Sequence, residues 1–153
     1  MDTVDRKRSA KKELILKTAA TMFRERGFAA SSMRDLAEKI GIEAASLYNH
    51  IQSKAQILEE IITGVAELCK NHLINIDKNN STSLQKIESL IRFHTNMMIH
   101  HFEEYSVMVN EWMHLEKDKL NLFAQARREY VKRMEAIVQE GIDKGELKPI
   151  MPY

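Results

Sequence analysis

Cysteine, glycine and proline are scarce in this chain. A single cysteine, Cys69, among 153 residues excludes an internal disulfide framework and any paired-cysteine metal site. Five glycines and two prolines leave few positions at which a helix must end. No apolar run approaches the length of a membrane-spanning helix, and the charged N-terminus lacks the apolar stretch of a secretory signal. We therefore expect a cytoplasmic protein without membrane association.

Recognisable catalytic motifs are also missing. The chain has no Gly-rich phosphate loop, no nucleophile elbow and no HExxH sequence. Six histidines are present, but the adjacent pair His100 and His101 would point about 100° apart on a helix, and no HxxxH spacing occurs. We expect no enzyme, no metal and no other cofactor, although a small-molecule effector is possible. A small helical enzyme and a helical protein-interaction module remain the alternatives.

Charge is distributed unevenly along the chain. Residues 1–54 contain eleven Lys and Arg against seven Asp and Glu, whereas the remainder is slightly acidic. A basic front part joined to an acidic body fits a module that faces nucleic-acid phosphates. Such a split is common in ordinary domains, so charge alone does not establish DNA binding.

Helical spacing of apolar residues continues through nearly the whole sequence, which predicts an all-α fold. Gly27, Gly41 and Gly145 are the expected helix ends, and Ser32, Ser53 and Thr82 are the expected N-caps. The predicted helices span about 10–26, 33–40, 44–50, 54–76, 83–101, 105–114 and 118–144.

The segment SSMRDLAEKIGIEAASLYNHIQSK, residues 31–54, carries the most specific signal. Two short helices separated by Gly41 give the outline of a helix-turn-helix. The Ser31–Ser32 pair, Gly41–Ile42, Leu47–Tyr48 and Ser53–Lys54 resemble the DNA-reading signature of the tetracycline-repressor-like (TetR) family. The resemblance covers about residues 10–60, and helix order alone extends it further. It implies an N-terminal three-helix DNA-binding domain followed by a helical ligand-sensing bundle.

Candidate DNA contacts follow from the exposed side expected for the second short helix. Asn49 can pair with adenine, Ser46 and Tyr48 can reach bases or phosphates, and Lys54 and Arg34 add positive charge. Tyr48 could instead lie at the edge of the core, and Arg34 could pair with Glu38. The full set of predicted contacts is Ser32, Arg34, Ala44, Ala45, Ser46, Tyr48, Asn49, His50 and Lys54.

The basic run Arg6–Lys7–Arg8 has two interpretations. It could lie along a phosphate backbone or minor groove, or it could be a solvated tail. The sequence does not choose between them.

The body, by resemblance to the family, encloses a small apolar or acyl-CoA-like effector. Met and aromatic residues there suit an adaptable apolar cavity, although ordinary core packing is the better explanation for any one of them. Arg127 shares a predicted apolar face and needs an anionic partner, either Glu111 or the ligand. The predicted ligand contacts are Met97, Met98, Trp112, Phe123, Arg127, Arg128 and Tyr130.

Domain boundaries and assembly complete the sequence-based expectations. We expect a DNA-binding domain over 1–52 and a regulatory domain over 53–153, with the helix that begins after Ser53 coupling the two. One reader helix covers few base pairs, so we expect a homodimer on a palindromic operator of double-stranded DNA. Family members carry two further helices that form the subunit interface. We therefore expect that this chain either lacks them and dimerises poorly, or dimerises through other surfaces.

Overall fold

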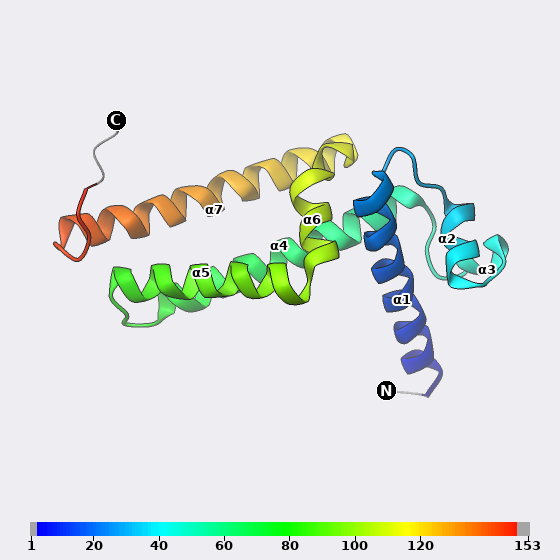
Figure 1. The fold of residues 1–153 in the computed structure, drawn as a ribbon, viewed down its shortest axis with the longest axis horizontal. Coiled ribbons are helices and arrows are strands. Elements are labelled where there is room, and N and C mark those ends of the chain that lie inside the picture. The colour runs from blue at the N-terminus through cyan, green and yellow to red at the C-terminus, as the bar shows by residue number, and fades with distance from the viewer. Residues whose placement is uncertain (1–2, 150–153) are drawn as a thin grey trace.

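The computed structural model describes the backbone of residues 3–149 and the side chains of residues 10–149. Its described part is helical, as predicted, and contains no strand. In Figure 1 an elongated body of long helices lies beside a smaller unit in which α1 crosses one end of the body. The elements are α1 (Thr3–Arg26), α2 (Met33–Ile40), α3 (Ala44–Tyr48), α4 (Lys54–Lys78), α5 (Ser83–His100), α6 (Phe102–Asn110), the short 3₁₀ helix η1 (Trp112–His114) and α7 (Lys117–Asp143).

Helix α1 begins earlier than the sequence pattern predicted. It starts at Thr3 rather than near Ala10, because neither glycine nor proline interrupts the intervening residues. The backbone of Arg6–Lys7–Arg8 is therefore helical, which argues against a disordered tail. The side chains of residues 1–9 lie outside the described part, so the predicted phosphate contact of this basic run stays a prediction.

Two short helices form the predicted helix-turn-helix. The Ser32 hydroxyl accepts a hydrogen bond from the Asp35 backbone N–H at 3.1 Å and begins α2. Gly41 ends α2 in the left-handed region at φ 78°, a conformation that glycine adopts without steric cost. Helix α3 ends at Tyr48 rather than at His50, so Asn49 is its C-cap and His50 lies in the following turn.

The body begins at α4, whose first turn is capped by Ser53 through the backbone N–H of Gln56. A reciprocal capping box between Thr82 and Gln85 begins α5, in agreement with the sequence pattern. The predicted break at 102–104 was misplaced: the interruption is at His101, and α6 begins directly at Phe102. The predicted helix over 105–114 is in fact α6 followed by η1, because the backbone turns at Glu111.

One apolar cluster joins the small N-terminal unit to the body. Phe23 of α1, Leu47 of α3 and Val107 of α6 are fully buried in this cluster. Leu115, which follows η1, is buried in it as well. Two smaller clusters lie along the body, one around Leu73 and Ile137 between α4 and α7 and one around Met97 of α5. The core of the reader is therefore completed by residues that lie more than fifty positions further along the chain.

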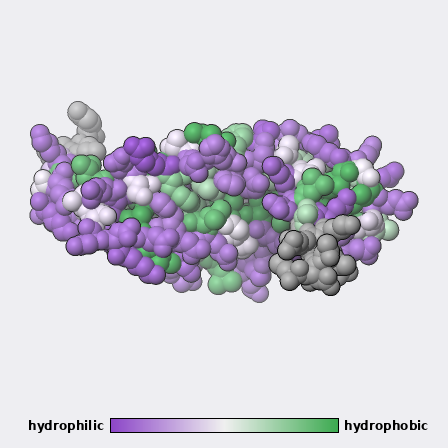
Figure 2. Space-filling view, turned by 90° about the horizontal axis from the view of Figure 1, so that it is seen from below, coloured by the Kyte–Doolittle hydropathy of each residue, from purple (hydrophilic) through white to green (hydrophobic). Residues whose placement is uncertain are grey.

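Surface polarity is mixed along the molecule. On the face that Figure 2 presents, hydrophobic residues alternate with hydrophilic ones. No helix in the described residues is both long enough and apolar enough to cross a membrane.

Candidate nucleic-acid interface and its link to the body

Helix α3 presents one face to the core and another to solvent. Leu47 is fully buried against α1 and α2, which fixes the orientation of this five-residue helix. On the opposite side Tyr48 is 51 % exposed, and Ala45 and Asn49 are exposed as well. A short helix anchored from behind, with polar groups in front, is the shape required for insertion into a major groove.

The neighbouring predicted contacts surround this face. Ser32 and Arg34 at the start of α2 are exposed, and Arg34 has no carboxylate within ion-pair distance among the described residues, so the alternative pairing with Glu38 is wrong. Ala44, Ser46 and His50 are half-buried. Eight of the nine predicted contacts therefore lie on or beside the surface of the helix-turn-helix.

Lys54 has a different contact set from the one that the sequence suggested. Its ammonium donates hydrogen bonds to the backbone oxygens of Phe28 and Ser31, each at 2.8 Å. It also lies 4.3 Å from the centre of the Phe28 ring, which adds a cation–π interaction. In this conformation Lys54 joins the loop after α1 to the start of α4, and its predicted phosphate contact stays a prediction.

Replacing Lys54 by alanine should therefore destabilise the protein. Two carbonyl groups lose a charged donor, a loss that typically costs about 1–3 kcal/mol. Chemical unfolding should show this decrease, whereas Lys70→Ala, at an exposed position of the same helix, should change stability by less than about 0.5 kcal/mol. Unchanged stability together with a reduced salt dependence of DNA binding would instead assign Lys54 to the phosphate backbone.

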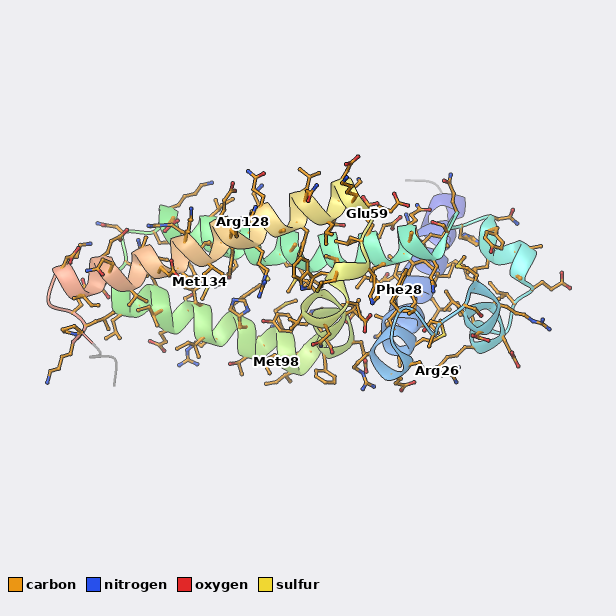
Figure 3. All side chains as sticks on the ribbon, turned by 90° about the horizontal axis from the view of Figure 1, so that it is seen from above. Arg26, Phe28, Glu59, Met98, Arg128 and Met134 are labelled. Carbon is orange, nitrogen blue, oxygen red and sulfur yellow. The ribbon has the colours of Figure 1, made fainter. Side chains whose placement is uncertain are left out.

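Helix α6 connects the reader to the body. Glu103 at its start forms an ion pair with Arg24 of α1. Just after its end, the Glu111 carboxylate accepts a hydrogen bond from the Phe28 backbone N–H at 3.2 Å. The His114 ring lies 5.4 Å from the Phe28 ring. Figure 3 shows Phe28 where the two parts of the molecule meet, so a movement of α6 would act directly on the end of α1.

A polar network lies inside the body. His94 of α5 is hydrogen-bonded through Nδ1 to the Tyr105 hydroxyl at 3.0 Å and through Nε2 to the Tyr130 hydroxyl at 2.9 Å. Burial lowers the pKa of His94, and the nearby His72 lowers it further. Burial also raises the pKa of Tyr105 and Tyr130. The network thus holds α5, α6 and α7 together through neutral groups.

The predicted ligand contacts do not converge on one cavity. Met97 is buried in the cluster that also contains Val65 and Cys69, while Met98 is 54 % exposed. Figure 3 shows Met98 and Arg128 on opposite sides of the body. Tyr130 is engaged with His94, and Phe123 packs against the Trp112 ring at 5.7 Å between centroids.

Arg127 does not lie on a buried apolar face. Its side chain is exposed, and the carboxylate of Glu111 contacts Phe28 and His114 rather than Arg127, so the predicted internal ion pair is wrong. Its guanidinium lies 5.5 Å from the centre of the Trp112 ring. Of the predicted ligand residues, the structure brings Trp112, Arg127 and Arg128 together at one surface depression.

Two residues that organise the link and the network, Glu103 and Tyr105, were not singled out from the sequence, and the contacts of His94 and Glu111 were not foreseen. Each pairs with a residue more than ten positions away. For the network, the sequence offered one signal: His94, Tyr105 and Tyr130 lie on helices that were expected to pack together. That signal does not specify which side chains make contact.

An exposed recognition helix on a three-helix unit, packed against a longer helical body, defines the class of helix-turn-helix DNA-binding regulators. Comparisons with known proteins agree with this class. Residues 15–61 match the family described as bacterial regulatory proteins, tetR family, and residues 80–152 match the tetracyclin repressor-like C-terminal domain. The chain belongs to the TetR family of transcriptional regulators and is not an enzyme.

Individual relatives give the same assignment. The repressor KstR2 of Mycolicibacterium smegmatis is 30% identical over 142 residues, which cover 92% of this chain and 69% of that protein. The structure of the ketosteroid regulator KstR2 of Mycobacterium tuberculosis superposes with a TM-score of 0.86 at 24% identity, over 93% of this chain and 73% of that one. The structure of AibR in complex with isovaleryl coenzyme A and operator DNA has a TM-score of 0.78 at 21% identity, over 91% and 76% of the two chains.

Proposed function

We propose that this regulator is a repressor that binds a specific operator and is released by a small effector. The observation that carries the proposal is the orientation of α3, with Leu47 fully buried and Tyr48 and Asn49 exposed. The KstR2 relatives are described as transcriptional repressors, which supports repression over activation. Ala45 would approach a thymine methyl group, and Ser46 and Asn49 would contact base edges.

The operator that we propose is a palindrome bound by a homodimer. A single short recognition helix contacts few base pairs, so specific affinity at physiological salt requires two of them. Two-fold protein symmetry then places the half-sites a whole number of helical turns apart on double-stranded DNA. Arg34 and the helix start at Ser32 would contact phosphates and fix the register.

The effector that we propose is an acyl-CoA thioester. AibR, which has the same fold over 91% of this chain, is described in complex with isovaleryl coenzyme A and operator DNA. That complex supports the class of effector, and the release of DNA is our proposal. Helix α4 runs from the reader into the body, where Val65 and Leu73 are buried. An effector that displaces this stretch, or α6 beside it, would shift the equilibrium between two separations of the readers. The free energy of that shift cannot exceed the effector's differential affinity for the two states.

A binding assay with the DNA upstream of the protein's own gene tests the repressor proposal. We expect a complex whose affinity falls steeply with salt and that competitor DNA of random sequence does not remove. Addition of isovaleryl coenzyme A should then release the DNA. Equal binding to operator and random DNA would contradict sequence-specific repression.

Asn49→Ala should relax recognition at one position of each half-site. The amide side chain that can bridge adenine N6 and N7 is lost, which typically costs about 1–3 kcal/mol at that base pair. Selection from a library of randomised sites should return a degenerate base at that position and leave the others unchanged. Gln52→Ala, at an exposed position beyond the end of α3, is the control. Recovery of the original motif by the Asn49 variant would remove Asn49 from the base-reading set.

A further inference from the structure

The arginines of the body fall into two groups. Arg92 pairs with Glu88 at 2.8 Å, and Arg133 pairs with Asp77 at 2.6 Å and with Glu140. Arg127 and Arg128 are different, because neither has a carboxylate within 4.0 Å among the described residues. Two adjacent unpaired guanidinium groups are therefore available on the surface of α7 to an anion from outside the chain.

These two arginines line a shallow, open depression of the surface. The Trp112 ring is fixed by its contact with Phe123, and the guanidinium of Arg127 lies over its face. Lys132 adds a third cation, and Glu135 is the single carboxylate of the lining. The residues that line the depression are Trp112, Ala124, Arg127, Arg128, Val131, Lys132 and Glu135.

This composition fits a multiply charged anion that also has an apolar or aromatic part. Guanidinium groups bind phosphate through paired, planar hydrogen bonds, and three cations around one opening exceed what a single carboxylate needs. The indole ring, Ala124 and Val131 provide apolar contact beside the charges. Figure 3 shows Arg128 on α7 at a distance along the body from the reader, so the phosphates bound here would not be those of the operator.

We propose that the depression at Trp112, Arg127 and Arg128 binds the phosphate groups of a coenzyme A thioester, outside the packed interior of the body. This inference rests on the proposed effector class and adds the location of the charged part of that effector. It keeps the ligand as the anionic partner of Arg127 and moves the contact from the apolar face expected from the sequence to the exposed face of α7.

Trp112 allows a direct test, because it is the only tryptophan of the chain. Coenzyme A and isovaleryl coenzyme A are titrated separately while the indole fluorescence is followed. We expect saturable changes with both compounds, and weaker binding at higher salt. Arg127→Ala combined with Arg128→Ala should raise the Kd at least about tenfold, the effect of losing roughly one charge-assisted interaction. Isothermal titration calorimetry measures the same Kd independently of the Trp112 environment.

Matched controls separate the site from general charge effects. Arg92→Ala removes one exposed arginine from α5 and should leave the Kd unchanged. Arg127→Lys combined with Arg128→Lys retains the charge and should bind with intermediate affinity, and circular dichroism should show that each variant keeps its helical content.

Several results would overturn the proposal: no saturable change in the parent chain, parent-like affinity in the folded double alanine variant, or an equal loss in Arg92→Ala. Binding of isovalerate as tightly as its coenzyme A thioester would also overturn it, because phosphates would then contribute nothing. Operator binding is measured separately on the same samples. Its absence would count against the repressor proposal while leaving the coenzyme A titration interpretable.

Discussion

Phe23→Ala should destabilise the whole molecule by about 3–5 kcal/mol, the usual loss for a fully buried phenylalanine. Phe23 is completely inaccessible and packs edge-on against Phe28 at 5.2 Å between ring centroids. Its cluster includes Val107 from α6 and Leu115. Because total stabilities of such domains are commonly about 5–15 kcal/mol, this single change would remove a large share.

The same variant tests how the reader and the body unfold. A core shared between α1 and α6 should make both parts unfold in one cooperative transition, which shifts to lower denaturant in Phe23→Ala. Fluorescence of Trp112 and far-ultraviolet circular dichroism should therefore report the same midpoint. Leu122→Ala, at a position that is 64 % exposed, should stay within about 0.5 kcal/mol of the parent. Two separate transitions would show that residues 1–52 and 53–153 are energetically independent domains.

Local signals in the sequence predicted the helices and the reader well. The capping residues Ser32, Ser53 and Thr82 and the glycine ends at Gly41 and Gly145 act within one or two turns, so their effects can be inferred without knowledge of the fold. The orientation of α3 could also be inferred, because the apolar Leu47 must face the core and its polar neighbours then face solvent.

Long-range contacts could not be inferred in the same way. Helical periodicity assigned Arg127 to an apolar face of its helix, but the side chain is exposed. Whether a helix face is covered depends on how far the neighbouring helices extend along it, and periodicity does not show this. The contacts of Lys54 within the chain could not be foreseen, because its partners, two backbone oxygens in the loop after α1, carry no sequence signature. The pairing of Glu103 with Arg24 likewise depends on the path of α6 across α1.

The network around His94 should make the stability of the body depend on pH. Burial lowers the pKa of this imidazole in the folded protein, whereas the unfolded chain binds a proton near its ordinary value of 6.5. The unfolded state therefore takes up more protons as the pH falls below about 6.5, and the free energy of unfolding decreases there. Above that pH both states are neutral at His94, and its contribution to stability is fully present.

Removal of one hydrogen-bonding partner of His94 should also destabilise the body. The neutral imidazole has one donor and one acceptor nitrogen, so one tyrosine hydroxyl accepts and the other donates. Tyr130→Phe leaves one of these nitrogens without a partner in a half-buried site, at a cost of about 1–3 kcal/mol. Tyr105→Phe should cost a similar amount, and the double variant should deviate from additivity because both act on one ring.

Urea unfolding of the parent and of His94→Gln between pH 5 and 7.5 measures both effects. In this range Asp77, whose pKa is lowered by Arg133, stays ionised and does not contribute to the slope. The titratable groups around His94 are His72, Tyr105, Tyr130 and Cys69. Burial raises the pKa of the Cys69 thiol to about 11, so this thiol also stays neutral in the range.

We expect His94→Gln to be less stable than the parent at pH 7.5 and to lose less stability than the parent on acidification. His100→Gln, at the exposed end of α5, should keep the parental slope. An identical slope in the parent and in His94→Gln would show that His94 does not control the pH response.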